Sequence, residues 1–335
     1  MRKPKTIIIA EAGVNHNGDI KIAKKLVDIA KKHGADFIKF QAFKADLLTT
    51  GQLEKASYQK NTVGVGFQQE MLKNLELPFS HLKELQKYSK KEGIGFMLSG
   101  FDDESLKFMK TLKLDYVKVP SGEIDNVPYL RKVASMKRKI ILSTGMSFLK
   151  EVEFAIKTLK KAGIPKKDLT ILHCNTEYPT PLSDVNLRAM LTLKDKLRVD
   201  VGYSDHTNST EVSMCAVALG ARIIEKHITL DKKMPGPDHS SSIEPDELHS
   251  FIKSIRLVEK ILGSRKKVPS RSEKKNIPFA RKVIVASKFI KKGSAFTENN
   301  LTAKRAGKGL SPSNWDIVLK KRAKKDFQEE ERIKI

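Results

Sequence analysis

The segment VDVGYSDHTNSTEVSMCAVALGARIIEKH, residues 199–227, contains the pattern that decides the fold. Apolar, β-branched runs at its two ends predict strands, and residues 210–219 between them predict a helix. In a parallel α/β unit of this kind both strands end at the same carboxyl edge of the sheet, where such folds bind ligands. His206 and His227 close the two strands, so we expect their imidazoles to face each other at that edge.

The same alternation of an apolar run and an amphipathic stretch occurs eight times before residue 263. The predicted strands are 6–11, 36–43, 95–101, 116–120, 139–144, 170–174, 199–204 and 222–227. Eight such units, with strands apolar on both faces, predict an α/β fold, a closed (β/α)8 TIM barrel. A doubly wound open sheet is the competing architecture, but GVNHNG at 13–18 lacks the glycine spacing of its dinucleotide fingerprint.

The rest of the chain predicts a boundary and a second domain. Residues 264–278 begin with the polar, basic SRKKVPSRS and are typical of a linker that follows a catalytic barrel at 1–263. Residues 279–335 contain short β-type runs, turns and a helical stretch at 315–323. They predict a small β-rich domain.

Net charge, cysteine content and the length of apolar runs indicate which classes of partner and location to expect. The chain carries 64 Lys and Arg against 39 Asp and Glu, a net charge of +25. Its lysines are spread over the predicted helices with no interleaved aromatic platform, so we expect attraction of anionic substrates and no specific nucleic-acid binding. Cys174 and Cys215 indicate reduced thiols. The apolar run 6–10 is too short to span a membrane and continues without a cleavage site, so we expect a cytoplasmic protein with no membrane contact.

The histidine pair is a candidate metal site. Two neutral imidazoles with room for water and a substrate oxygen predict that His206 and His227 hold a catalytic divalent metal. The alternative is that each histidine is only a hydrogen-bonded residue at a strand end. Long loops at 44–78 and 229–245 fall on the same side of the barrel and are candidate lids.

Lysines occur inside two of the predicted strands. Lys39 and Gln41 alternate with apolar residues, so the period of two places both on one face, inside the barrel. Lys118 lies within the apolar run 116–120. Because an unpaired buried lysine is costly, the two lysines predict a phosphate or carboxylate ligand, or a Schiff-base nucleophile. The alternative is that each lysine points to solvent at a strand end.

Hydroxyl and carboxyl groups also mark the strand ends. Four serines lie there in register: Ser99, Ser121, Ser143 and Ser204. Together they predict a cradle for an oxyanion or a phosphate. Glu11, at the end of the first strand, and Asp238, in the loop after the last, are candidate acids or bases. A solvated loop position is the alternative for Asp238, and NHNG at 15–18 is equally consistent with a turn that starts a helix.

Several ordered motifs resemble those of a known family. They are GVNHNGD (13–19), KFQAFKAD (39–46), VPSGEI (119–124), ILSTGM (141–146), LHCNTEYPTP (172–181), GYSDHT (202–207), EKHITLDK (225–232) and GPDHSSSIEPDEL (236–248). Over residues 6–261 the chain resembles the sialic acid synthase family. VIVASKFIKKGSAFTENNLTAKRAGKGLSP (283–312) resembles the antifreeze-like (SAF) C-terminal domain of that family.

The resemblance implies a transferase that condenses phosphoenolpyruvate with an N-acetylated hexosamine and water, and releases phosphate. With N-acetylmannosamine as the sugar the product is N-acetylneuraminate, which is the activity that we expect. A divalent metal, Mn or Mg, is implied at the residues matching His206 and His227, where it makes the sugar aldehyde electrophilic. Dimers of the family are domain-swapped, so we expect a homodimer in which Arg305 of one protomer reaches the N-acetyl group of the sugar in the other.

The resemblance also implies roles for the polar strand ends. Phosphoenolpyruvate is held by residues that match Lys39, Ser99, Lys118, Ser121, Ser143 and Ser204. Glu11 and Asp238 match carboxylates that contact the sugar and transfer protons, and Gln41 and Tyr178 match further residues of the site.

Two positions depart from the family pattern. LSGFD at 98–102 has Gly100 where the family has proline, which predicts a looser loop and weaker phosphate binding. KRAG at 304–307 has Ala306 in place of proline beside the arginine. We expect activity to survive both changes.

Legionaminic acid synthases share these motifs and use 2,4-diacetamido-2,4,6-trideoxymannose, so the motifs leave the sugar open between the two. PSGE at 120–123 disfavours the pseudaminic acid branch. A Schiff-base aldolase would need no metal, and borohydride would trap its imine. A non-enzymatic polyanion-binding protein would show salt-sensitive binding and no phosphate release.

Overall fold

The computed structural model describes residues 5–335, which form two compact units with a boundary between Gly263 and Ser264. Residues 1–4, the start of the predicted domain 1–263, lie outside the described residues. Within the described chain, none of the helices has the length and apolar character needed to cross a membrane.

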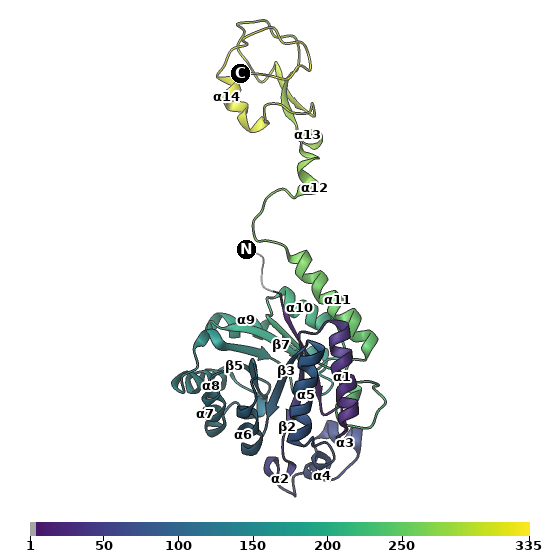
Figure 1. The fold of residues 1–335 in the computed structure, drawn as a ribbon. Helices are drawn as coiled ribbons and strands as arrows, with labels where there is room; N and C mark the ends of the chain where they lie inside the picture. Colours follow the sequence, from purple (N-terminus) through teal and green to yellow (C-terminus); the bar gives the residue numbers. More distant parts are fainter. Residues whose placement is uncertain (1–4) are drawn as a thin grey trace. The chain divides into compact units, whose positions relative to one another are not determined.

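The first unit is a closed barrel of eight parallel strands in sequence order, which confirms the predicted TIM barrel (Figure 1). The strands are β1 (Ile7–Gly13), β2 (Phe37–Ala42), β3 (Gly95–Gly100), β4 (Tyr116–Val119), β5 (Lys139–Ser143), β6 (Leu169–His173), β7 (Asp200–Asp205) and β8 (Ile223–His227). β1 pairs with β2 on one side and with β8 on the other. Its register places Glu11 beside Lys39 and His227. Closure of the barrel thus brings together polar residues from the two ends of the domain.

Helices on the outside of the barrel connect the strands (Figure 1). They are α1 (Ile20–His33), α5 (Phe79–Glu92), α6 (Asp103–Thr111), α7 (Val127–Ser135), α8 (Leu149–Lys161), α9 (Arg188–Leu197), α10 (Glu211–Ala218) and α11 (Pro245–Leu262). Helix α1 shows how the sequence sets such bounds. The side chain of Asp19 accepts a hydrogen bond from the backbone of Lys21 at its start, and Gly34 adopts φ 89° at its end.

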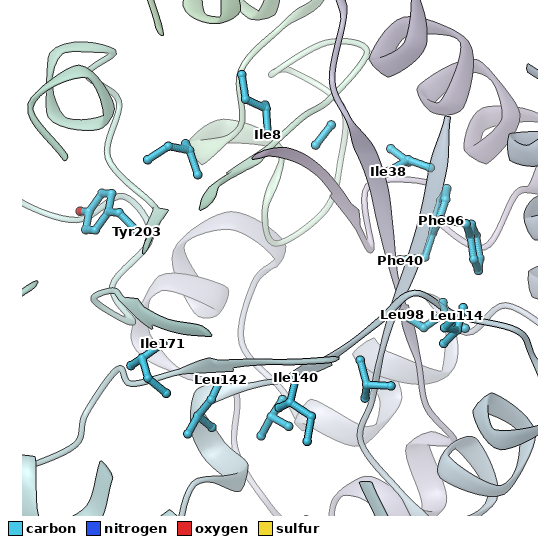
Figure 2. Packing of buried hydrophobic residues seen from close by; sticks show 14 of the residues in the cluster. Ile8, Ile38, Phe40, Phe96, Leu98, Leu114, Ile140, Leu142, Ile171 and Tyr203 are labelled. Atoms are coloured by element: carbon cyan, nitrogen blue, oxygen red, sulfur yellow. The ribbon is translucent and has the colours of Figure 1, made fainter. Parts of the chain in front are cut away.

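Apolar residues pack on both faces of the barrel strands. On the outer face, Ile38, Phe40 and Phe96 belong to the large core between strands and helices (Figure 2). On the inner face, a smaller cluster fills the barrel: Ile9, Met97, Ile141, Leu172 and Ile223. Each of these buried side chains contributes about 1.5–3 kcal/mol. Because side chains alternate along a strand, Ile9 points the same way as Glu11, so the inner cluster closes the barrel below the polar strand ends.

The loop expected at 44–78 is folded. It contains three short helices, α2 (Ala45–Leu48), α3 (Ser57–Val63) and α4 (Gln68–Lys73). Met71 and Leu75 pack with Val14 and Phe43 in a small core of their own. The candidate lid is therefore anchored to the barrel by apolar contacts. Single 3-10 turns occur elsewhere at η1 (Ser121–Glu123), η2 (Lys166–Asp168), η3 (Leu182–Asp184), η4 (His239–Ser241) and η5 (Pro312–Asn314).

Gly100 lies at the end of strand β3 and not in a loosened loop, so that expectation from the sequence is wrong. A Cβ atom at this position would lie 2.7 Å from Sδ of Met109 and 3.1 Å from Cδ2 of Leu106, both in α6. Its carbonyl oxygen accepts a hydrogen bond of 2.7 Å from the hydroxyl of Tyr129. The glycine therefore allows close packing of α6 on β3.

His16, in the turn after β1, makes the stability of the barrel depend on pH. Its side chain is 1% exposed, and burial lowers its pKa from 6.5 to about 4. Protonation is then easier in the unfolded chain, so its contribution to stability is complete above pH 6.5 and is lost as the pH falls towards 4. We expect protonation of this residue to lower the free energy of unfolding by about 3 kcal/mol over this pH range. Urea unfolding between pH 7.5 and 4.5 should show a shallower decrease for His16→Asn than for the wild type, and equal slopes would contradict the assignment.

The second unit contains the antiparallel pair β9 (Val283–Ala286) and β10 (Leu301–Lys304), and the helix α14 (Trp315–Leu319). Its core comprises Ile284, Ala286, Ile290, Phe296, Leu301, Val318, Ala323, Phe327 and Ile333. The helix expected over 315–323 ends at Leu319, because the next residues pair with another segment. The backbone of Ala323 donates a hydrogen bond to the carbonyl of Ser294 (2.9 Å).

The segment expected to be a linker, residues 264–278, is not entirely irregular. It contains α12 (Arg271–Lys274), and α13 (Ile277–Ala280) extends just beyond it. The hydroxyl of Ser270 accepts a hydrogen bond from the backbone of Glu273 and caps α12. This local cap explains why a polar, basic segment still forms a helical turn.

Candidate active site

The carboxyl ends of the barrel strands surround a cavity of about 410 Å³. Predicted site residues that line it are Glu11, Lys39, Gln41, Ser99, Lys118, Ser121, Ser143, Tyr178, Ser204, His206, His227 and Asp238. They come from strand ends far apart in sequence, which the closed barrel brings to one place. Arg305 lies in the second unit, directly after β10, and is exposed.

His206 and His227 face each other in the wall of the cavity, with ring centroids 5.5 Å apart and planes at 69°. Nδ1 of His206 donates a hydrogen bond to the carbonyl of Asn175, which can only accept, so Nε2 keeps its lone pair. The ring of Tyr178 stacks on His206 at 4.1 Å, with its hydroxyl 3.2 Å from Nε2. Nδ1 of His227 is buried and has no hydrogen-bond partner within residues 5–335.

Both histidines are in the form that binds metals. Burial lowers the pKa of His206 to about 4 and that of His227 well below its usual value, so both are neutral at pH 7. The described residues contain no cluster of three or more His, Cys, Asp and Glu arranged to hold a metal. The pair, with an unpaired ring nitrogen on His227, fits a divalent ion that takes its remaining ligands from water or substrate.

Four charged side chains lie together at the floor of the cavity, each at most 4% exposed. Nζ of Lys39 lies 2.8 Å from Glu11 and 3.7 Å from Glu225, and Nζ of Lys118 lies 3.5 Å from Glu225. The hydroxyl of Ser204 donates a hydrogen bond of 2.9 Å to Glu225. Glu225 is thus the central carboxylate of this charge cluster.

The charge cluster separates the pKa values of its two acids. Burial raises the pKa of Glu11 to about 7, against the attraction of Lys39. Burial opposes ionisation of Glu225 as well, but Lys118 and Lys39 outweigh it and lower the pKa to about 2. Burial also lowers the pKa of Lys118. At neutral pH Glu225 therefore stays charged, whereas Glu11 exchanges its proton and suits acid or base catalysis.

Glu225 is the residue that the sequence reasoning missed. The buried position of Lys39 and Lys118 shows that they do not point to solvent, but their partners are carboxylates of the protein. Burial of the lysines therefore does not by itself require an anionic ligand. The signal was present in β8, because Glu225 precedes His227 by two residues and so shares its inward face.

The serines supply hydroxyl groups around the charge cluster. Lys39 donates a hydrogen bond of 3.2 Å to Ser99, and the backbone of Gly145 donates one of 3.0 Å to Ser121. The hydroxyl of Ser143 is buried and has no hydrogen-bond partner within the described part of the chain. Its position in the cavity lining makes it available to an anion.

Both candidate lids contribute to the cavity. The segment 44–78 lines it through Tyr58, Gln59, Gln68, Met71, Leu72 and Leu75, which were not identified individually from the sequence. The ring of Tyr58 lies 5.2 Å from that of Tyr178 and extends the stack on His206. From the other lid, Asp238 reaches within 3.8 Å of Nδ1 of His227. It is 8% exposed and not solvated, and burial raises its pKa to about 6.

Comparison with known proteins agrees with this geometry. The chain matches the NeuB family over residues 26–267 and the SAF domain over residues 281–334. N,N'-diacetyllegionaminic acid synthase of Campylobacter jejuni is 50% identical over 98% of this chain and 99% of that protein. The synthase of the same name from Legionella pneumophila is 46% identical over 93% of this chain and 88% of its own length.

A solved structure shows the same relationship. The N-acetylneuraminic acid (sialic acid) synthetase of Leptospira borgpetersenii, in complex with citrate, is 35% identical and superimposes with a TM-score of 0.73. The match covers 82% of this chain and 90% of that chain. With the barrel, the second unit and both family matches in agreement, the chain is an enzyme of the NeuB family with a C-terminal SAF domain.

Proposed function

We propose that this chain is an N,N'-diacetyllegionaminic acid synthase, which condenses phosphoenolpyruvate with 2,4-diacetamido-2,4,6-trideoxymannose and water and releases phosphate. The observation that carries this proposal is 50% identity over nearly the full length of both chains to a synthase of that name. The solved sialic acid synthetase is only 35% identical. We therefore replace the expectation of N-acetylmannosamine as the sugar. The motifs that led to it belong to chemistry that sialic and legionaminic acid synthases share.

Phosphoenolpyruvate fits the charge cluster at the floor of the cavity. With Lys39, Lys118 and Glu225 charged, the cluster has a net charge of +1 when Glu11 is protonated and is neutral when Glu11 is ionised. The protonated form attracts an anion. The free hydroxyl of Ser143 and those of Ser99 and Ser121 would add donors to the phosphate and the carboxylate, and Ser204 would join them by turning its hydroxyl away from Glu225.

We also propose that His206 and His227 hold Mn or Mg. When bound, the metal supplies a Lewis acid that polarises the aldehyde of the open-chain sugar. Tyr178 holds the ring of His206 by stacking, and Asn175 sets its tautomer, so the lone pair on Nε2 is oriented before any ligand arrives.

The acids then carry the protons. Carbon 3 of phosphoenolpyruvate attacks the aldehyde carbon, and Asp238, beside His227, donates a proton to the aldehyde oxygen. The charge of Glu225 stabilises the cationic character that develops at carbon 2. Water adds to carbon 2 and gives one proton to the ionised form of Glu11, which a pKa of about 7 keeps populated at neutral pH. The hydroxyl formed at carbon 2 gives its proton to the phosphate as the C–O bond breaks and the keto group forms. Of the two protons of the water, one therefore ends on the former aldehyde oxygen and the other on phosphate.

Phosphate release is the direct test. We would measure it with phosphoenolpyruvate and either 2,4-diacetamido-2,4,6-trideoxymannose or N-acetylmannosamine, with Mn and after treatment with EDTA. Metal-dependent release with the first sugar, at a much higher kcat/KM than with the second, is expected. The reverse preference would assign the chain to sialic acid synthesis. Release with neither sugar, or an imine trapped by borohydride, would contradict the synthase assignment.

Mixed dimers test the proposed domain swap. If Arg305 of one protomer completes the site of the other, Arg305→Ala and His227→Ala are expected to be inactive alone but to complement each other. The Arg305→Ala barrel would then be capped by an intact partner tail. After unfolding and refolding as an equal mixture, about a quarter of the wild-type activity should return. Mixtures that stay inactive while forming dimers would contradict a swapped site.

A further inference from the structure

The turn after β1, Asn15-His16-Asn17, has no role in the proposed chemistry, yet its first two side chains are buried. Nδ2 of Asn15 donates hydrogen bonds to the carbonyl of Ile228 (2.9 Å) and to the hydroxyl of Ser242 (2.8 Å). That hydroxyl in turn donates a hydrogen bond of 2.7 Å to the carbonyl of Asp238. The turn at the start of the barrel therefore reaches the backbone of Asp238 through one serine.

Asn17 and His239 form a second connection between the same two segments. Nδ2 of Asn17 donates to the carbonyl of Pro235 (2.9 Å). Its Oδ1 can only accept, so Nε2 of His239, 3.2 Å away, carries the proton of that ring. Nδ1 of His239 then accepts from the hydroxyl of Thr229 at 2.6 Å. The imidazole thus links Asn17 to the beginning of the lid 229–245.

Gly236 permits this arrangement. It adopts φ 152°, and a Cβ atom there would lie 2.6 Å from Cδ2 of His239 and 3.1 Å from Oδ1 of Asn17. A side chain there would therefore displace the imidazole of His239 and crowd Asn17, which would disturb the hydrogen bond between them. The turn 15–17 and the segment 235–242 are built to lie directly against each other.

The carboxylate of Asp238 depends on these contacts for its position. Within residues 5–335 no hydrogen bond holds the carboxylate itself, and Nδ1 of the neutral His227 lies 3.8 Å from it. Burial and the fixed backbone on either side are what aim it into the cavity. A shift of the backbone by about 1 Å would move the acid away from its substrate, and such shifts reduce rates about 100-fold.

We propose that Asn15, Asn17 and His239 are positioning residues that hold Asp238 over His227 at the sugar end of the cavity. The inference deepens the proposed function and rests on its use of Asp238 as the acid for the sugar. It explains why a buried polar turn at the start of the barrel meets a glycine and a histidine of the last lid.

The first measurement does not need catalysis. Hydrogen exchange followed by mass spectrometry should show faster exchange of residues 235–242 in Asn17→Ala than in the wild type. Asp19→Ala is the matched control, because this exposed residue caps α1 in the same connection and has no contact with the lid. Unchanged exchange in Asn17→Ala, or equal acceleration in Asp19→Ala, would overturn the proposal. This outcome is independent of which sugar, if any, the protein uses.

The second measurement is a double-mutant cycle with Asp238→Ala. Asn17→Ala is expected to lower kcat/KM for the sugar by about 10- to 100-fold and to leave KM for phosphoenolpyruvate unchanged. In the Asp238→Ala background the same substitution should add less than about a twofold loss, because its effect passes through that acid. Additive losses would overturn the link to Asp238. Absence of wild-type turnover with both sugars would instead contradict the proposed function.

Discussion

His227→Ala is expected to weaken binding of Mn by more than about 100-fold and to remove nearly all phosphate release. The reason is that the proposed site has only two protein donors, so loss of one leaves a single imidazole, His206, to hold the ion. Of the two histidines, His227 is the one with a buried ring nitrogen, Nδ1, that has no hydrogen-bond partner among the described residues, so this nitrogen is free to bind the ion. Titration calorimetry with Mn on the EDTA-treated protein measures binding apart from activity.

His173→Ala is the matched control for this prediction. His173 also ends a barrel strand, β6, but its Nε2 hydrogen-bonds the carbonyl of Val185 at 2.8 Å, and it does not line the cavity. We expect this variant to bind Mn as the wild type does. Wild-type affinity in His227→Ala would show that the histidine pair is not the metal site.

Glu225→Gln is expected to lower kcat by at least about 100-fold without raising KM for phosphoenolpyruvate. The substitution keeps the size of the side chain but removes the negative charge between Lys39 and Lys118. The lysines would then attract an anion more strongly, while the cationic character at carbon 2 would lose its stabilising charge. Steady-state kinetics in both substrates separate the two effects. A raised KM with an unchanged kcat would contradict the role given to Glu225.

The same substitution should destabilise the empty enzyme. Breaking a buried ion pair on one side costs about 3–5 kcal/mol, because the remaining charges stay buried without their partner. Phosphoenolpyruvate, which would replace the missing charge, is expected to raise the Tm of Glu225→Gln by more than it raises that of the wild type. Glu123 lies outside the charge cluster and the cavity lining, so Glu123→Gln provides the control. It should change neither the stability of the empty enzyme nor the rise in Tm on addition of phosphoenolpyruvate. Equal shifts by the ligand would contradict the electrostatic account.

Much of the fold could be predicted from hydrophobic period alone. The strand at 139–144 is β5 (Lys139–Ser143), and the helical stretch after it, α8, runs over Leu149–Lys161. The predicted ends of elements were wrong where the backbone forms hydrogen bonds with a segment distant in the sequence. In the second unit, α14 stops at Leu319 because the residues beyond it hydrogen-bond the turn near Ser294. Local propensity carries no information about that partner.

The residues of the site were predicted in part. Those that were missed depend on contacts between strands, which the sequence does not show. Lys39 and Lys118 could be placed inside the barrel by the period of two, but the identity of their partners could not. Glu11 meets Lys39 through the pairing of β1 with β2, and only closure of the barrel between β8 and β1 brings Glu225 to Lys39 and Lys118. Likewise Gly100, interpreted from the sequence as a residue that loosens a loop, lies in strand β3 and allows close packing of α6.

The sequence by itself determined the alternation of strands and helices, the inward face of each strand and the residue types at the strand ends, because these depend on local period and chain order. Tertiary structure alone decided how those residues interact. It paired two buried lysines with Glu11 and Glu225, gave the two histidines their unprotonated form, and tied the turn 15–17 to Asp238. Each of these outcomes depends on burial and on distances of a few ångströms between residues of different strands and loops, which no local pattern encodes.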